Sequence, residues 1–478
     1  MDSKPSRLHP IVIAAAALAS ALALFFGKGL QPVWWLVWLA PLPLLLIAPR
    51  LSARTVFGVS CLAAAVGELN LWHYFREAPP LISLLVVLVP SALFALAVLL
   101  FRRCVLRGRL PQAAIIFPAF WITYEYLLAI NSPHSTAFNL AYTQMNFLPI
   151  LQIASVTGIW GISFCVLLFS ATLAALWTIP GQAQQKKFLA VGVGVFLLAV
   201  FGFGEWRLHP QATANSVKVA LIASDLPQNT LPTTQEDSMR LLHDYAIEVD
   251  KISSQQPLAI VLPEKIGVIR ESYLDPADSL LASTASHAHA VLVVGLIRRD
   301  ARGLWNEARV YLPEGGAPLT YEKHHMLPPF ESQFTVGTSR TILHEPSGTW
   351  GITICKDMDF PQLSREYARE ETALLLVPAW DFDFDGWLHG RMAILRGVED
   401  GFSIARAPRH GILTISDDRG RVLAERSTNS APFATLVATI PVTHHVTLYS
   451  RWGDWFAWLC ILLFLASFFL ARRPAPVT

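Results

Sequence analysis

Apolar residues along the chain gather in long runs, which shorter polar segments interrupt. A helix that crosses a bilayer needs about 20 mostly apolar residues, and the sequence contains eight runs of this kind. They cover residues 11–27, 33–49, 55–72, 81–101, 111–130, 147–179, 188–205 and 453–471. The sixth run is longer than one span requires, and Pro149 and Gly158 indicate an interfacial segment before its span. The pattern therefore predicts a polytopic helical membrane domain of about eight spans.

A more polar region separates the seventh run from the eighth. Short apolar strands are expected at residues 217–223, 258–262, 290–297, 308–312, 351–354, 373–377, 411–416 and 421–424. Helices are expected over about twenty residues ending near Ile252 and at residues 276–288, 361–371 and 388–400. Strands that alternate with helices predict an α/β domain whose sheets are covered by helices. We therefore divide the chain into a transmembrane domain (1–206), an α/β domain (207–452), and a last span with its tail (453–478).

Composition and charge support this division and set its orientation. The chain is 53% hydrophobic and only 15% charged, whereas soluble domains have about 25% charged residues. Basic residues favour cytoplasmic loops, and an inside N-terminus places twelve of them there, against Lys28 and Arg76 outside. The twelve are Lys4, Arg7, Arg50, Arg54, Arg102, Arg103, Arg107, Arg109, Lys186, Lys187, Arg472 and Arg473. Both termini are therefore expected in the cytoplasm and the α/β domain outside it. The net charge of +2 is too small to indicate a nucleic-acid partner.

The cysteines single out one position. Four of the five lie in or beside predicted spans, and Cys355 is alone in the α/β domain. Exported domains normally use cysteines in pairs, as disulfides. A lone thiol in an oxidising compartment is either a buried inert side chain or a reactive group.

Three segments place a reactive side chain just after a predicted buried strand. Residues 259–264 (Ala-Ile-Val-Leu-Pro-Glu) end at Glu264, residues 319–325 (Leu-Thr-Tyr-Glu-Lys-His-His) contain Lys323, and residues 351–357 contain Cys355. Side chains converge at strand ends in α/β domains. A thiol becomes a good nucleophile only as the thiolate, so it needs a base or a cationic neighbour. Each residue alone also fits an ordinary surface charge or a buried thiol.

Together these segments resemble the nitrilase superfamily of carbon–nitrogen hydrolases, which use a Glu–Lys–Cys triad. Seven N-terminal spans, an outer nitrilase-like domain and one final span narrow the resemblance to the apolipoprotein N-acyltransferase family. Lys-His-His-x-x-Pro at 323–328, with Glu331 shortly after, fits the same family. The resemblance implies an α-β-β-α sandwich on the periplasmic side of a bacterial inner membrane. It also implies acyl transfer from a phospholipid, through a Cys355 thioester, to the N-terminal amine of a diacylglyceryl-cysteine lipoprotein, without a cofactor or metal.

The resemblance also assigns roles to single residues. Glu264 would be the general base, and Lys323 would stabilise the oxyanion together with the backbone N–H of Lys356. Glu331 would orient Lys323, and Asn306 would orient the site.

Other residues keep two interpretations. Glu399 fits a family helix under the triad, but a structural salt bridge with Arg396 explains it equally well. His324 and His325 are adjacent, and adjacent residues on an extended chain point to opposite faces, so we expect no metal there. Glu68 and Glu125 fall within predicted spans, where carboxylates are costly and often functional. We favour bonds to neighbouring helices for both.

Three departures from the family keep the acyl acceptor open. Only about thirty residues separate Lys323 from Cys355, the segment after the cysteine is Lys-Asp-Met-Asp-Phe-Pro, and the family's Ala-x-Asn-x-Gly element has Arg409 in place of asparagine. The alternative function is therefore a membrane-bound amidase of a lipid-like substrate, in which water resolves the thioester. A non-enzymatic binding protein with a degenerate domain is a third interpretation. The oligomeric state is not indicated.

Overall fold

The structure, a computed structural model, describes residues 8–75, 79–209, 215–229 and 231–471. The chain forms two compact units. The helical unit comprises Met1–Asn131, Phe138–Leu208 and Asp454–Thr478, and the α/β unit comprises Ser132–Ala137 and His209–Gly453. Five residues of the charge argument lie outside the described residues: Lys4, Arg7, Arg76, Arg472 and Arg473.

In the described part of the helical unit, five helices are long and apolar enough to cross a membrane. They are α1 (Pro10–Gly27), α6 (Pro80–Leu106), α7 (Leu110–Asn131), α10 (Ile159–Thr178) and α11 (Ala183–Leu208). Helix α10 is buried along most of its length, whereas α11 is mostly exposed. The remaining apolar runs form shorter helices, so the count of eight spans stays a prediction.

A proline and a glycine explain why two of the predicted runs differ from single long helices. The second run is divided into α2 (Leu36–Leu39), α3 (Leu42–Ile47) and η1 (Ala48–Arg50), with Pro41 at the first break. The sixth run is divided into α8 (Leu148–Leu151), α9 (Ala154–Thr157) and α10, and Gly158 separates the last two with φ of 66°. The short helices between and after these are α4 (Ala53–Glu68), η2 (Leu69–Leu71), α5 (Trp72–Phe75), η3 (Leu140–Gln144) and α17 (Trp455–Leu470).

The α/β unit contains two sheets. In the first, the strand order is β13 (Ala434–Pro441), β1 (Ser216–Ala223), β2 (Ala259–Val261), β4 (Val291–Asp300), β5 (Gly303–Tyr311) and β6 (Leu319–Glu322), and β3 (Val268–Arg270) also pairs with β4. In the second, the order is β12 (Val422–Ser427), β11 (Ile412–Ser416), β10 (Ser403–Pro408), β9 (Thr372–Ala379), β8 (Gly348–Ile352) and β7 (Thr341–Glu345). Strands β1, β2 and β4 run parallel, as do β8, β9 and β10.

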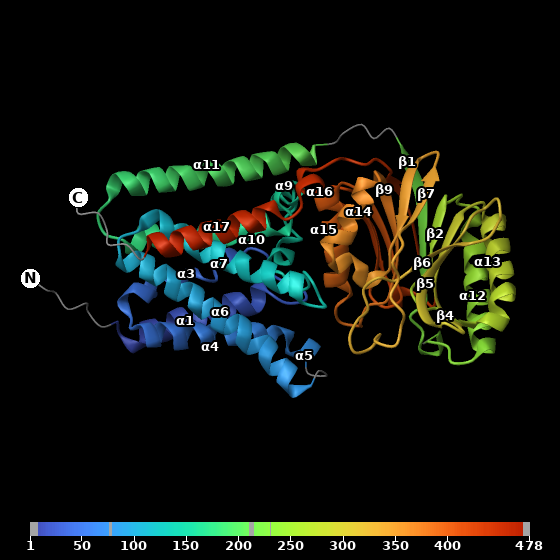
Figure 1. Cartoon of the computed structure of the whole chain (residues 1–478), viewed down its shortest axis with the longest axis horizontal. Coiled ribbons are helices and arrows are strands. Elements are labelled where there is room, and N and C mark those ends of the chain that lie inside the picture. Colours follow the sequence, from blue (N-terminus) through green and yellow to red (C-terminus); the bar gives the residue numbers. More distant parts are fainter. Residues whose placement is uncertain (1–7, 76–78, 210–214, 230, 472–478) are drawn as a thin grey trace, which may run out of the picture. The chain divides into compact units, whose positions relative to one another are not determined.

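Helices cover the outer face of each sheet, so the unit has four layers (Figure 1). Helices α12 (Gln235–Ser253) and α13 (Leu274–Ala288) pack on the first sheet, and α14 (Pro361–Arg369) and α15 (Gly386–Asp400) pack on the second. Side chains alternate along a strand: Val219 and Leu221 face the core between the sheets, whereas Ala220 and Ile222 face the helices. The predicted α-β-β-α sandwich is confirmed.

Candidate active site

Lys323 lies at the centre of a buried group of charges in the α/β unit. It directly follows β6, and only 1% of it is exposed. Its Nζ donates to Glu264 Oε1 at 2.9 Å and to Glu331 Oε2 at 2.8 Å. Burial alone would lower the pKa of Lys323, but the two carboxylates outweigh burial and raise the pKa well above its usual value. Lys323 therefore keeps its positive charge.

Glu264 follows β2, and its two carboxylate oxygens differ in their hydrogen bonding. Its Oε1 accepts hydrogen bonds from Lys323 and, at 2.6 Å, from Nδ2 of Asn306 on β5. Asn306 also donates to Glu331 Oε1 at 3.1 Å. The second oxygen, Oε2, is buried and has no hydrogen-bond partner among the described residues. Leaving a buried acceptor unpaired costs free energy, so this oxygen is available to take a proton from a reacting group.

A glycine on the neighbouring strand admits Glu264 to this position. Gly295 of β4 donates its N–H to the carbonyl oxygen of Pro263 at 3.1 Å. A Cβ at Gly295 would lie 2.5 Å from the Cα of Glu264, which is closer than real side chains come. The absence of a side chain at Gly295 therefore allows the backbone of Glu264 to approach the sheet.

Cys355 follows β8 and begins the 3₁₀ turn η6 (Cys355–Asp359). Its φ is +44°, which is uncommon for a residue other than glycine, and such strain is concentrated at functional sites. The thiol donates to the carbonyl oxygen of Trp380 at 3.5 Å. Burial and the nearby Glu264 raise the pKa of Cys355, whereas Lys323 and Arg406 act in the opposite direction. The thiol is therefore protonated at rest and needs a base to become a nucleophile.

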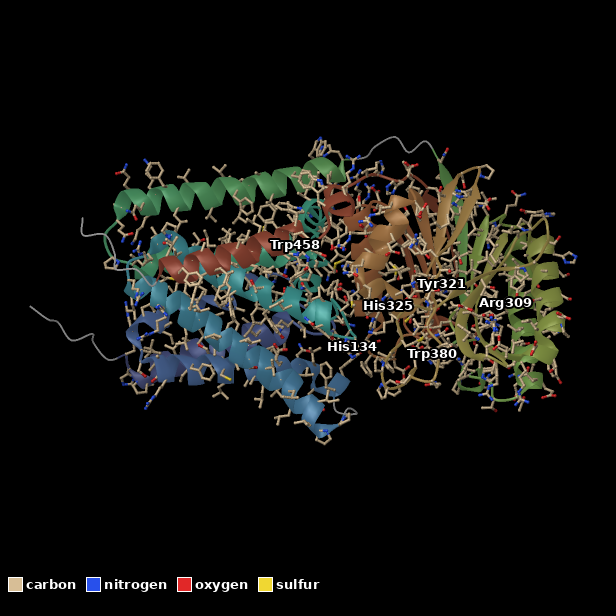
Figure 2. The ribbon with its side chains drawn as sticks, in the orientation of Figure 1. His134, Arg309, Tyr321, His325, Trp380 and Trp458 are labelled. Carbon is tan, nitrogen blue, oxygen red and sulfur yellow. The ribbon has the colours of Figure 1, made fainter. Side chains whose placement is uncertain are left out.

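Asp357 joins the lysine segment to the cysteine segment, and sequence reasoning did not identify it. It is fully buried, and its Oδ2 accepts from the hydroxyl of Tyr321 at 2.8 Å. Its Oδ1 accepts from the backbone N–H of His325 at 2.9 Å and also contacts that ring's Nδ1 at 2.9 Å. Figure 2 labels Tyr321 and His325. A carboxylate two residues after the predicted nucleophile was the available sequence signal.

Lys356 is positioned by its side chain as well as by its place in the chain. Its Nζ lies 3.1 Å from Asp359 Oδ2 and 3.2 Å from Nδ1 of His134. His134 belongs to the short segment Ser132–Ala137, which is part of the α/β unit. Burial, reinforced by Lys356, lowers the pKa of His134 to about 4, so its ring is neutral and its Nδ1 can accept a hydrogen bond from the Lys356 ammonium. The role of the Lys356 backbone N–H as an oxyanion donor stays a prediction.

Glu399 lies on α15 in a fully buried ion pair with Arg396, and their closest atoms are 2.9 Å apart. This geometry fits the structural salt bridge that the sequence left open. A role for Glu399 beneath the triad stays a prediction.

Lys265 is the second residue that sequence reasoning missed. It directly follows Glu264, and its Nζ lies 2.5 Å from Glu331 Oε1 and 3.5 Å from Glu264 Oε1. The same atom lies 5.0 Å from the ring centroid of Trp380, which follows β9 and is labelled in Figure 2. Burial would raise the pKa of Glu331, but Lys323 and Lys265 outweigh it and lower the pKa to about 2.

Two arginines near Trp380 differ in whether their charge is paired. Arg406 of β10 forms a buried ion pair with Asp381, the residue after Trp380. Arg409 places its guanidinium 4.6 Å from the Trp380 ring centroid. Its three guanidinium nitrogens are buried and have no hydrogen-bond partner within the described ranges. Burial therefore lowers the pKa of Arg409.

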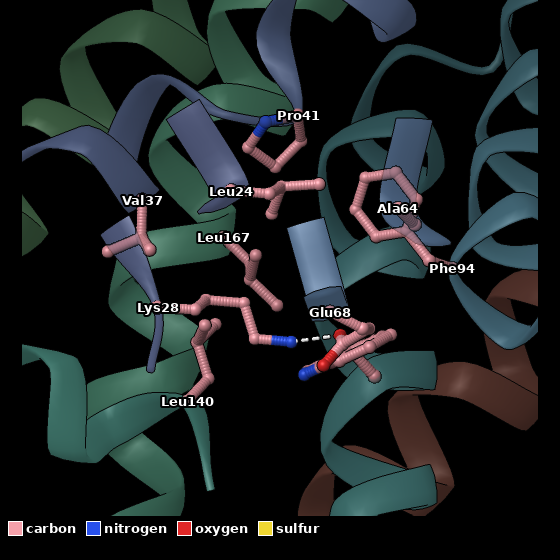
Figure 3. Close-up of a pocket in the computed structure, with 10 residues that line it drawn as sticks. Leu24, Lys28, Val37, Pro41, Ala64, Glu68, Phe94, Leu140 and Leu167 are labelled. Atoms are coloured by element: carbon pink, nitrogen blue, oxygen red, sulfur yellow. Dashed lines mark hydrogen bonds and ion pairs between the residues drawn. The ribbon is translucent and has the colours of Figure 1, made fainter. Parts of the chain in front are cut away.

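The two carboxylates predicted within spans make local bonds in the helical unit. Glu68, at the end of α4, pairs with Lys28 in a pocket lined by apolar side chains such as Leu24 and Phe94 (Figure 3). Glu125 of α7 accepts the N–H of Leu140 at 2.8 Å. These contacts confirm the favoured interpretation, in which both carboxylates bond neighbouring segments.

Known proteins match most of this chain. Residues 20–172 match the apolipoprotein N-acyltransferase N-terminal domain. An apolipoprotein N-acyltransferase of Geobacter metallireducens is 28% identical over 508 residues, covering 96% of this chain and 94% of the relative. That of Haemophilus ducreyi is 26% identical and covers 98% of both chains. Among solved structures, an amidase from Nesterenkonia sp. is 20% identical with a TM-score of 0.42, covering 49% of this chain and 94% of its own.

Proposed function

This chain belongs to the apolipoprotein N-acyltransferase family, and from that premise we propose that it transfers an acyl chain from a membrane phospholipid to the N-terminal amine of a diacylglyceryl-cysteine lipoprotein. Cys355 is the nucleophile, Glu264 the general base and Lys323 the cation that stabilises the oxyanion. The observation that carries this assignment is the different hydrogen bonding of the two carboxylate oxygens of Glu264. Its Oε1 accepts hydrogen bonds from Lys323 and Asn306, and its Oε2 is buried without a hydrogen-bond partner among the residues that the structure describes.

In the first half-reaction, Glu264 Oε2 takes the thiol proton while the Cys355 sulfur attacks the ester carbonyl of the phospholipid. The tetrahedral oxyanion is stabilised by the Lys323 ammonium and the backbone N–H of Lys356. One such donor contributes about 3–4 kcal/mol in the transition state. The C–O bond of the ester then breaks, Glu264 returns its proton to the leaving alkoxide, and a lysophospholipid departs. The acyl chain remains as a thioester on Cys355.

In the second half-reaction, the lipoprotein amine attacks the thioester carbonyl and Glu264 takes a proton from the amine nitrogen. The C–S bond breaks, the proton passes to the departing Cys355 sulfur, and the amide product leaves a free thiol. Glu331 keeps Lys323 in place through the 2.8 Å contact, and Asn306 joins the two carboxylates. The same five side chains thus serve both halves of the cycle.

Both proposed substrates reside in a bilayer, one as a phospholipid and one as a lipid-anchored protein, which explains a catalytic domain carried by apolar helices. We assign residues 1–206 and 453–478 to the bacterial inner membrane and residues 207–452 to the periplasmic side, with both termini cytoplasmic. The basic residues of the short loops support this orientation. Cysteine-labelling of single loop positions from either side of sealed vesicles would test it, and modification of an α/β-unit surface cysteine from the cytoplasmic side would contradict it.

The function is tested by incubating the purified full chain with phosphatidylethanolamine and measuring intact mass. We expect an acyl adduct on Cys355, which is lost when a diacylated lipopeptide is added, with a matching gain on the peptide amine. Cys355→Ala should form no adduct, and the matched variant Cys61→Ala, in the helical unit, should behave as the wild type. An adduct that decays to free fatty acid regardless of the peptide would instead identify the membrane-bound amidase or hydrolase.

A further inference from the structure

The buried charges beside Cys355 balance only when Lys265 is counted. Two carboxylates, Glu264 and Glu331, share the contacts of Lys323. With Lys323 alone, the group would carry one excess negative charge next to the thiol. Lys265 supplies the second positive charge, at 2.5 Å from Glu331 Oε1 and 3.5 Å from Glu264 Oε1.

The remaining charges that face Cys355 do not change this count. Arg406 and Asp381 both act on the thiol, and they form an ion pair with each other. On its other side, Lys265 faces the ring of Trp380. The backbone carbonyl oxygen of Trp380 accepts the hydrogen bond from the Cys355 thiol. Glu264 and Lys323 also act on the thiol, and they are the two groups that Lys265 and Glu331 contact, so Lys265 acts on Cys355 through them.

The backbone at Lys265 is adapted to this placement. Its φ is +58°, in the left-handed region that residues other than glycine rarely adopt. The unfavourable conformation is consistent with a side chain held by its contacts to the carboxylates rather than by local preference.

We propose that Lys265 is a positioning residue of the acyl-transfer reaction, which neutralises Glu331 so that the charge of Lys323 acts on the Cys355 thiolate and on the oxyanion. The inference rests on the proposed role of Cys355 as the nucleophile. Without Lys265, Glu331 competes fully for Lys323, and thiolate formation takes place against a net negative charge. A like charge near a titrating group opposes ionisation of an acid.

The test is the rate of Cys355 alkylation by iodoacetamide as a function of pH, measured by peptide mass on the full chain. Lys265→Gln keeps a hydrogen-bond donor for Glu331 but removes the charge. The midpoint is the pH at which the alkylation rate reaches half of its maximum. We expect the midpoint of Lys265→Gln to rise by about one pH unit, with about tenfold slower alkylation at neutral pH. Lys265→Arg keeps the charge and should retain the wild-type midpoint. Lys251→Gln, which breaks an exposed pair with Glu248, is the matched control.

Glu331→Gln provides the opposite change. It removes one negative charge, so its midpoint should fall, and the Lys265→Gln/Glu331→Gln double variant should return to the wild-type midpoint. An unchanged midpoint in Lys265→Gln would overturn the proposal, as would a double variant that fails to compensate. If Lys265→Gln does not fold, the comparison of Glu331→Gln with the double variant decides the question: the midpoint should be higher in the double variant, and equal midpoints would overturn the proposal.

Failure of this inference is distinguishable from failure of the proposed function. Alkylation requires neither phospholipid nor lipopeptide. A wild type that forms no acyl adduct, together with the expected midpoint shifts, would reject the acyltransferase and keep the role of Lys265. An acyl adduct with unshifted midpoints would do the reverse.

Discussion

Each unit of this chain buries a lysine–glutamate grouping, and the two groupings are built differently. In the helical unit, Lys28 pairs with Glu68 among apolar side chains, beside a cavity of about 20 Å³ (Figure 3). That space holds about one water molecule. In the α/β unit, Lys323 is shared by Glu264 and Glu331.

The two groupings differ in whether a carboxylate oxygen remains without a partner after the charges have paired. The pair at Lys28 joins one cation to one anion, which is sufficient to hold two segments together. The group at Lys323 leaves Glu264 Oε2 without a hydrogen-bond partner in the described ranges, and Glu264 acts electrostatically on Cys355, whose backbone conformation is strained. Strain and an unsatisfied acceptor lower stability, so their presence together indicates a site kept for chemistry rather than for folding.

The largest effect is expected where the spare acceptor is removed. Glu264→Gln keeps the shape of the side chain but cannot take a proton, so acyl-adduct formation on Cys355 should fall about 10³-fold. The measurement is the rate of adduct formation by intact mass, with Glu248→Gln, a partly exposed carboxylate of α12 that pairs with Lys251, as control. Adduct formation near the wild-type rate would mean that another group is the base.

Substitutions at the Lys28–Glu68 pair of the helical unit should lower the stability of the protein rather than remove a catalytic group. Lys28→Met leaves the Glu68 carboxylate buried without its partner, which costs about 3–5 kcal/mol. The Lys28→Met/Glu68→Leu double variant should regain most of this loss, because no charge remains. Thermal unfolding in detergent, followed by circular dichroism, measures both. A double variant as unstable as the single one would show that the pair is not the source of the stability.

Strands buried on both faces were predictable because they form continuous apolar runs. This is true of β1, β2, β4 and β9, all of which the sequence located. The strand β10 was missed because it contains Arg406, whose buried partner Asp381 lies 25 residues earlier in the chain. Strand β3 is only three residues long, which is too short for a periodic signal.

The site was predictable to a similar extent. Glu264, Lys323 and Cys355 follow apolar strands, and the structure brings the first two into contact and places Cys355 within their electrostatic influence. Lys265 was not predictable, because its contact with Glu331 joins positions 66 residues apart. Asp357 likewise bonds Tyr321 across 36 residues. Long-range pairing of charges leaves no local pattern in a sequence.

A smaller effect concerns the pH range over which the site stays charged. The folded-state pKa of Glu331 is about 2, below the usual value of about 4.3. A depressed pKa contributes stability that is fully present above about pH 4.3 and is lost as pH falls towards 2. The stability difference between wild type and Glu331→Gln should therefore shrink across that window. Denaturant unfolding at successive pH values measures it, and a constant difference would contradict the ion pairing of Glu331.

The smallest effect should come from a third arrangement, a buried cation with neither a carboxylate partner nor chemistry assigned to it. Arg409 stacks on Trp380, and its nitrogens have no hydrogen-bond partner in the described part of the chain. Arg409→Met keeps an apolar chain against the ring and removes the charge. The loss of the cation–π contact, about 1–2 kcal/mol, is opposed by a larger relief of burying an unpaired charge. We expect a net gain of about 1 kcal/mol, which raises the thermal midpoint by about 2–4 °C, whereas Arg409→Lys should give no gain. A lower midpoint in Arg409→Met would mean that the stacked cation stabilises the fold, and that an unpaired buried charge is not by itself a sign of function in this chain.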